Sequence, residues 1–108
     1  MTVRSAFSAG KLIVCLSGEL DHHQARTAMA AVDELLDEHL PRDCVLDLSG
    51  LNFMDSSGIA LILKLHRRQR ECGGRAWVEN PAEQPMRVID ASGIERLVPV
   101  SAGKGANI

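Results

Sequence analysis

The sequence predicts an α/β fold in which a mixed, mostly parallel sheet of about five strands has helices packed against it. Short β-branched and apolar runs alternate with longer runs of helical periodicity, an order typical of parallel strands joined by crossover helices. Only a short turn, Ala9-Gly10, separates the first two strand-like runs, which favours an antiparallel pair at one side of the sheet. A chain of 108 residues is long enough for one such domain with its own core.

The first part of the chain predicts a hairpin followed by an amphipathic helix. The expected strands are Thr2 to Phe7 and Leu12 to Leu16. Asp21 has the position of a helix N-cap, and Gln24 three residues later completes a capping box. The helix has an apolar stripe, which consists of Ala25, Ala28, Met29, Val32, Leu36 and Leu40. Pro41 ends the helix, because proline disfavours helical geometry in the residue before it.

The middle of the chain predicts a buried strand, a loop and a second helix. Cys44 to Leu48 is the strand and Ser49 to Met54 is the loop. The second helix runs from Ser56 to about Cys72, where Gly73-Gly74 stops it because glycine accepts the left-handed conformation of a helix C-cap.

The second helix has more apolar residues than one buried stripe requires. The stripe expected to face the sheet consists of Ile59, Ile62, Leu63 and His66. Leu61 and Leu65 then point elsewhere. Either a neighbouring helix covers them, or they form an exposed apolar patch beside Ser56 that marks a partner site.

The last part of the chain predicts two more strands and a third helix. Arg75 to Glu79 is a strand, and Pro85 to Ala91 is a helix with Pro85 near its first position. Leu97 to Val100 is the final strand, and Pro99 places it at an edge of the sheet. Small residues and glycines follow, so a flexible tail over residues 101–108 is expected after a single domain over residues 1–100.

Composition and charge exclude several classes of protein. The formal net charge of -2 argues against a general nucleic-acid binder. No apolar run reaches the roughly 20 residues needed to cross a bilayer, and no signal-peptide pattern opens the chain, so we expect a cytoplasmic protein without a membrane partner. Cys15, Cys44 and Cys72 lie far apart without a Cys-x-x-Cys pair, which argues against a metal or redox site, and we expect no cofactor.

The most informative segment is Asp55-Ser56-Ser57-Gly58, which places a carboxylate and two hydroxyls where the second helix begins. Unpaired N–H groups and the helix dipole favour negative charge there, including that of a phosphate. From the residues alone, a plain N-cap is the simpler interpretation. A nucleophilic serine needs a base, which only His22-His23 offers, and Met54 replaces the first glycine of Gly-x-Ser-x-Gly. We therefore expect no enzyme, and the adjacent histidines do not have metal-ligand spacing.

Three segments of the chain carry a resemblance to one protein family. These segments are Gly18 to His23, Leu51 to Gly58 and Asp90 to Ile94. They resemble the STAS domain of bacterial anti-sigma factor antagonists over about residues 1–100, and most closely the sporulation-type, or anti-sigma F factor, antagonists. The resemblance implies the STAS fold, which usually closes with a fourth helix. Because small residues follow Val100, we expect that last helix to be short or absent.

The resemblance also implies a function. Such an antagonist, when unphosphorylated, binds an anti-sigma factor that is itself a serine kinase, and a sigma factor is released. The kinase then phosphorylates the serine after the aspartate of the motif, here Ser56, and a serine phosphatase reverses this. With the apolar helix start included, the predicted partner-binding residues are Asp21, His22, His23, Asp55, Ser57, Gly58 and Leu61.

A STAS protein of another pathway is the alternative function, for example a stressosome scaffold or an accessory subunit of lipid transport. The presence of both Gly18 to Asp21 and Asp55 to Gly58 favours the antagonist. We expect a monomer or a weak homo-oligomer, since a shortened last helix leaves part of the sheet or of the second helix less covered.

Overall fold

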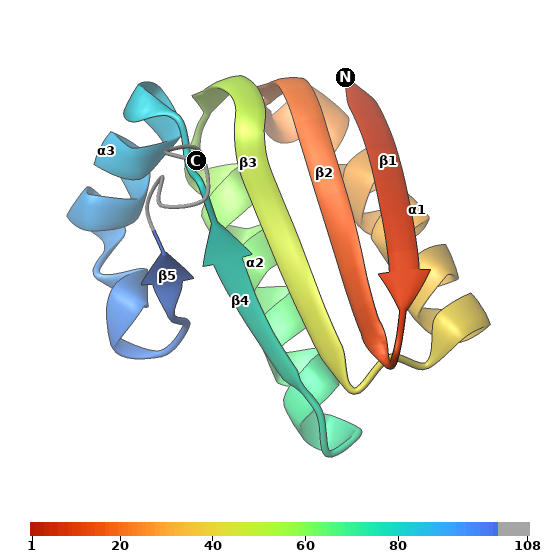
Figure 1. Ribbon diagram of the computed structural model, residues 1–108. Coiled ribbons are helices and arrows are strands. Elements are labelled where there is room, and N and C mark those ends of the chain that lie inside the picture. The colour runs from red at the N-terminus through yellow and green to blue at the C-terminus, as the bar shows by residue number, and fades with distance from the viewer. Residues whose placement is uncertain (102–108) are drawn as a thin grey trace, which may run out of the picture.

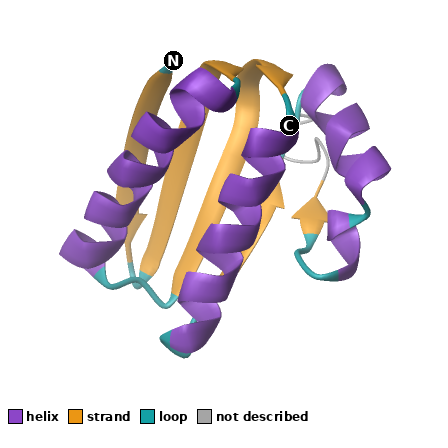
Figure 2. Cartoon of the chain, turned by 180° about the vertical axis from the view of Figure 1, so that it is seen from behind, coloured by secondary structure: helices purple, strands orange, loops and turns teal. Residues whose placement is uncertain are grey.

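In the computed structural model, which describes residues 1–101, the chain forms a five-stranded mixed sheet with the strand order β1-β2-β3-β4-β5 (Figure 1). The elements are β1 Thr2–Ser8, β2 Lys11–Leu20, α1 His22–His39, β3 Asp43–Met54, α2 Ser56–Glu71, β4 Arg75–Glu79, α3 Glu83–Ser92, a 3-10 turn Ile94–Arg96 and β5 Val100–Ser101. Helices α1 and α2 lie side by side on one face of the sheet, and α3 lies on the β5 side (Figure 2). The predicted fold class is confirmed.

The connections between strands bring two loops to one edge of the sheet. β1 pairs antiparallel with β2, and all other neighbouring strands pair parallel. Ala9 and Gly10 have φ angles of 53° and 80°, which are the left-handed angles that a tight hairpin turn requires. Because β2 and β3 are parallel, their carboxyl ends lie at the same edge, where α1 and α2 begin.

Strands β2 and β3 are longer than predicted, and the segment expected to be a loop, Ser49 to Met54, belongs to β3. It pairs with the end of β2 up to the Leu20–Met54 pair, with register shifts on the way. The shifts insert extra residues, so the buried positions after Leu48 come at Leu51 and Met54, which are 1% and 0% exposed. This three-residue spacing hides the strand from a search for strict alternation.

Helix α1 buries the predicted stripe at Ala28, Met29, Val32 and Leu36. Ala25 is half-buried. Leu40 is an exception, with 78% of its surface exposed. It is the C-cap residue with a φ of 46°, and this left-handed conformation turns the chain out of the helix before the stripe is complete.

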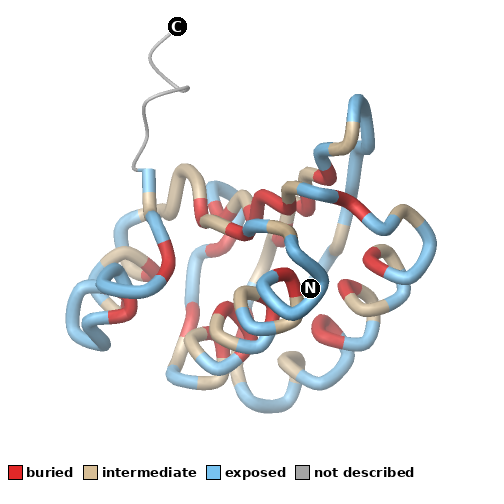
Figure 3. Tube along the Cα trace, turned by 90° about the horizontal axis from the view of Figure 1, so that it is seen from below, coloured by how far each residue is buried: buried red, intermediate tan, exposed pale blue. Residues whose placement is uncertain are grey.

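The buried face of α2 differs from the predicted one. It consists of Gly58, Leu61, Ile62, Leu65 and Gln69, whereas Ile59, Leu63 and His66 are only half-buried. Leu61 and Leu65 are 3% and 2% exposed, so of the two alternatives the exposed apolar patch is wrong, and Leu61 faces the neighbouring helix α1 across a shared groove. Figure 3 shows buried positions along the inner sides of the helices and exposed positions along their outer sides.

The last elements begin or end at other residues than predicted. Helix α3 begins at Glu83, with Pro85 at its third position, where proline is tolerated because the carbonyl four residues earlier lies outside the helix. Strand β5 is confined to Val100–Ser101, whereas Leu97 is 61% exposed after the 3-10 turn. β5 is an edge strand, as Pro99 indicates. The remainder of the predicted tail, and with it the predicted short or absent last helix, lies outside the described residues.

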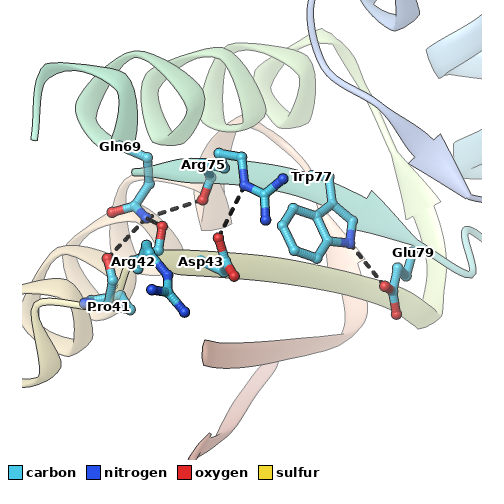
Figure 4. Close-up of polar contacts among 7 residues, drawn as sticks. All are labelled: Pro41, Arg42, Asp43, Gln69, Arg75, Trp77 and Glu79. Carbon is cyan, nitrogen blue, oxygen red and sulfur yellow. Dashed lines mark hydrogen bonds and ion pairs between the residues drawn. The ribbon is translucent and has the colours of Figure 1, made fainter. Parts of the chain in front are cut away.

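A buried glutamine forms hydrogen bonds at the amino ends of β3 and β4, the sheet edge opposite to the starts of α1 and α2 (Figure 4). The Nε2 of Gln69, a residue only 3% exposed, lies 3.2, 3.3 and 3.1 Å from the backbone oxygens of Pro41, Arg42 and Arg75, which share its two N–H donors. One side chain at the end of α2 thereby links the loop before β3 to the start of β4.

Candidate functional site

The two polar loops singled out in the sequence lie next to each other. Leu20 at the end of β2 pairs with Met54 at the end of β3, and the N–H of Asp55 donates to the Leu20 carbonyl at 3.3 Å. Asp21 and Asp55 therefore follow neighbouring parallel strands at the same edge of the sheet. This edge, with the starts of α1 and α2, is the candidate site.

Each aspartate caps the helix that follows it. Asp21 Oδ1 accepts hydrogen bonds from the backbone N–H groups of His23 and Gln24, both at 3.0 Å, which confirms the predicted N-cap. Within residues 1–101 no bond returns from the Gln24 side chain to the Asp21 N–H, so the capping box is only half formed. Asp55 Oδ1 accepts from the Ser57 N–H at 2.8 Å, so Asp55 is the N-cap of α2.

Ser56 is exposed at the first position of α2, whereas Ser57 is half-buried at the second. The Ser57 N–H is bound by the Asp55 carboxylate, and the Gly58 N–H donates to the Asp55 carbonyl at 3.0 Å. The helix start therefore offers fewer free N–H groups to a phosphate than the sequence suggests. Ser56 is instead an exposed residue next to a carboxylate that already occupies the positive end of the helix.

Gly58 is buried because the helix start sits directly on the core. A Cβ atom at this position would overlap Met54 Cγ and would lie 2.5 Å from Met54 Sδ, closer than Cβ atoms approach other atoms in folded proteins. The glycine lets α2 begin in contact with the end of β3. Gly58 therefore has a packing role, and the close contact that it allows determines where Ser56 lies at the sheet edge.

A shallow groove of about 490 Å³ runs between α1 and α2 and reaches the candidate site at Ser57. Its apolar lining consists of Ala25, Met29, Ala30, Ala60 and Leu61, and its charged lining consists of Arg26, Asp33 and Lys64. Leu61, predicted as a partner-binding residue, is a nearly buried part of this groove. The groove and the two loops form one continuous surface through Ser57.

His22 and His23 are exposed in the first turn of α1, with their ring centroids 4.0 Å apart. Neither ring forms a hydrogen bond with Ser56 in the described part of the chain, so no base is positioned for a nucleophilic serine. Over the same residues, 1–101, no group of three or more His, Cys, Asp or Glu side chains is placed to hold a metal ion. None of the described helices is long and apolar enough to cross a membrane.

Two residues of this edge were missed by the sequence analysis. Gln84, on α3, accepts from the Met54 N–H at 2.8 Å and donates to the Met54 carbonyl at 3.1 Å, as a neighbouring strand would. No sequence signal connects positions that lie 30 residues apart. Phe53 is 38% exposed in β3 beside Glu19, and it was placed in a loop because the strand was predicted too short.

Comparison with known proteins gives concordant results. Residues 3–105 match the STAS domain family. The anti-sigma F factor antagonist of Paenibacillus polymyxa is 37% identical over 91 residues, which cover 84% of this chain and 78% of that protein. The unphosphorylated form of the anti-sigma factor antagonist SpoIIAA has a similar structure, with a TM-score of 0.78 at 24% identity over 98% of this chain and 93% of that one. The phosphorylated form of the Bacillus cell fate determinant SpoIIAA has a TM-score of 0.70 at 24% identity, over 98% and 96% of the two chains.

Proposed function

Because the chain belongs to the STAS domain family, we propose that it is an anti-sigma factor antagonist that is switched off by phosphorylation at Ser56. In its unphosphorylated form it binds an anti-sigma factor serine kinase and thereby releases a sigma factor. The kinase phosphorylates Ser56 and ends the interaction, and a serine phosphatase restores it. The identity of 37% to an anti-sigma F factor antagonist supports the role, and the solved structure of SpoIIAA in a phosphorylated form supports the switch.

The observation that carries the proposal is the exposure of Ser56 at the edge where both capped loops meet. A kinase needs a hydroxyl that can enter its active site, and Ser56 is accessible there. Ser57 is less suited, since it is half-buried and its N–H is tied to Asp55. Of the two neighbouring serines, geometry therefore favours Ser56 as the acceptor.

The proposed partner surface consists of the predicted residues together with the groove. Asp21, His22, His23 and Asp55 supply polar groups at the edge, and Ser57 leads into the groove. Gly58 and Leu61 are buried, so they act through the shape of the surface rather than as protruding contacts. An apolar side chain of the kinase would occupy the groove near Met29 while the loops receive polar groups.

Charge explains how phosphorylation ends binding. A phosphate adds about -1.5 to -2 charge at neutral pH. At Ser56 it would stand beside the Asp55 carboxylate and in the loop region of Asp21, so the surface would become strongly acidic and bulkier. A loss of about 3 kcal/mol weakens association more than a hundredfold.

The fold is expected to survive the modification for a different reason than the sequence suggests. The helix is capped by Asp55, so Ser56 is not needed as a cap. A phosphate on the exposed Ser56 remains in water and displaces no buried group. Phosphorylation therefore changes the surface and leaves the core intact.

The first prediction tests this switch with purified kinase and ATP. Ser56→Ala should fold, bind the kinase and accept no phosphate, whereas Ser56→Asp should fold and bind at least about tenfold more weakly, because even one added charge opposes docking. Ser57→Ala is the matched control and should still be phosphorylated. Calorimetry gives the affinities and mass spectrometry the modified residue. Phosphate on Ser57, or undiminished affinity of Ser56→Asp, would contradict the proposal.

A further inference from the structure

The face of the sheet opposite α1 and α2 carries no helix within residues 1–101 (Figures 1 and 2). Residue pairing between strands shows which side chains share this open face. Its central row runs across four strands and consists of Ala6, Ile13, Val45 and Trp77. An apolar row therefore crosses the middle of the open face.

Trp77 is the largest side chain of this row and lies across the face. The side chains of Lys11 and Arg75 approach its ring, at 5.6 and 5.5 Å from the centroid. Lys11 lies on β2 and Trp77 on β4, so the two side chains meet over β3, which runs between these strands (Figure 4 shows Trp77). This placement explains why Val45 is only 1% exposed although no helix covers it. Trp77 itself remains half-buried, with part of its surface in water.

Charged and polar rows flank the apolar row on both sides. One row consists of Ser8, Lys11, Asp43 and Arg75, and the other of Arg4, Cys15, Asp47 and Glu79. In the second row the positive residue lies on β1, and the negative residues lie on β3 and β4. Burial raises the pKa of Asp47, but hydrogen bonds from Ser49 and Asn80 outweigh it and hold the pKa below its ordinary value. Asp47 is therefore a carboxylate at neutral pH.

We propose that a second copy of this chain binds the open face, related by a two-fold axis that runs parallel to the strands between β2 and β3. This axis places β1 of each copy over β4 of the other, and β2 over β3. Arg4 then meets Glu79 of the second copy, and Lys11 meets Asp43. In the central row Trp77 meets Ala6, and Ile13 meets Val45. Every contact occurs twice, as a two-fold interface requires.

The alternative two-fold axis, perpendicular to the strands, fits the charges less well. It would place each strand over the same strand of the second copy, and each flanking row over the other flanking row. Arg75 would then face Glu79 of the second copy, but Asp43 would face Asp47, and these like charges oppose association and offset the favourable pair. Both axes keep the strands of the two sheets aligned within about 30°, the usual arrangement of stacked sheets, so the charges decide between them.

The groups in the proposed contacts are available. Arg4 and Lys11 form no ion pair with any residue of the part that the structure describes, residues 1–101. Asp43 binds Arg75 at 3.2 Å and keeps 15% of its side chain exposed, and Glu79 accepts from Trp77 Nε1 at 2.8 Å. Each carboxylate has further acceptor positions for a second cation. The groove between α1 and α2 lies on the other face, so a dimer would leave it open.

The second prediction tests the dimer by charge exchange. The wild type should dimerise with rising concentration in analytical ultracentrifugation, and the emission of Trp77, the single tryptophan, should shift to shorter wavelength. Arg4→Glu and Glu79→Arg should each dimerise at least about tenfold more weakly, because each places two like-charge pairs in the interface. An equimolar mixture of the two variants should recover wild-type association, because both contacts again join opposite charges.

Glu34→Lys, an exposed charge reversal on α1, is the matched control and should dimerise as the wild type does. If Glu79→Arg disturbs Trp77, Lys11→Glu mixed with Asp43→Lys repeats the exchange in the other row. A wild type that stays monomeric, as it would if another protein or another part of this chain covered the face, would overturn the proposal. Equal association of the wild type and Arg4→Glu, or a mixture that fails to recover, would overturn it as well. None of these results involves Ser56, so they are independent of the proposed switch.

Discussion

At the scale of single residues, the four neighbours from Asp55 to Gly58 have different structural roles. Asp55 caps α2, Ser56 remains free at the surface, Ser57 opens into the groove and Gly58 lets the helix touch the core. Because capping and packing are assigned to Asp55 and Gly58, Ser56 has no structural task. A residue without a structural task can be modified without unfolding the protein.

The third prediction concerns Gly58→Ala. The added methyl group would overlap Met54 Cγ, which is buried, so we expect a destabilisation of about 1–3 kcal/mol, reduced in part by the better helix propensity of alanine. Urea unfolding measures it. Ser56→Ala, a change at an exposed position, is the control and should stay within about 0.5 kcal/mol of wild type.

The same contact can be tested from its other side. Met54→Ala removes the atoms that the new methyl group meets. The double variant with Gly58→Ala should therefore be more stable than the sum of the two single effects indicates. Strict additivity would show that overlap with Met54 is not the cause.

The sequence predicts residues well where a local pattern determines them. The Asp21 cap follows from an acidic residue directly before an apolar helical stripe, and the structure confirms it. Residues whose role depends on distant contacts are not predictable in this way. The sequence left open whether Leu61 is covered because its cover comes from α1, and Gln84 was missed because its partner is the backbone of Met54.

At the scale of elements, the end of β3 is held by a side chain instead of a strand. β4 ends at Glu79, which pairs with Asp47, so among residues 1–101 no strand lies beside the last part of β3 on that side. Gln84 supplies both hydrogen bonds to Met54 from α3. The position of the α2 start, and with it that of Ser56, thus depends on α3.

The fourth prediction tests this link. Gln84→Leu leaves the N–H and carbonyl of buried Met54 without partners, which we expect to destabilise the fold by about 1–3 kcal/mol in urea unfolding. Gln84→Glu keeps the acceptor for the N–H but loses the donor, so its effect should be intermediate. Arg87→Ala on the exposed side of α3 is the control, with an effect within about 0.5 kcal/mol. Equal stability of Gln84→Leu and Arg87→Ala would show that the hydrogen bonds are not needed.

Element boundaries show where sequence patterns stop being informative. β4 was predicted at its observed bounds, Arg75–Glu79, because glycines precede it and an asparagine and proline follow it. The extensions of β2 and β3 were missed because register shifts break their alternation. β5 was predicted to begin too early because Leu97 and Val98 are apolar, yet Leu97 is still the C-cap of the 3-10 turn Ile94–Arg96.

At the scale of the whole molecule, the sheet separates two surfaces with different proposed tasks. The helical face and its edge carry Ser56 and the groove, and the open face carries Trp77 between charged rows. The central strand β3 lies between them and contributes Cys44, which is 0% exposed. A probe at Cys44 therefore reports on the integrity of both surfaces at once.

The fifth prediction uses this thiol to measure global stability against pH. Burial raises the pKa of Cys44 from 9.0 to about 12. The unfolded chain loses this proton at lower pH than the folded chain. The contribution of Cys44 to the free energy of unfolding is therefore complete below about pH 9 and is lost as pH rises toward 12, by roughly 4 kcal/mol in all.

In a Cys15→Ser, Cys72→Ser background, alkylation of Cys44 should occur only through unfolding, and its rate should rise over this pH range by more than the rate of a model thiol does. Cys44→Ala in the same background should show a shallower fall of unfolding free energy between pH 9 and 11, because the titrating group is gone. Rapid alkylation at pH 8, where the folded thiol is neutral and covered, would mean that β3 opens without unfolding of the rest and that the two surfaces are not joined by one cooperative core.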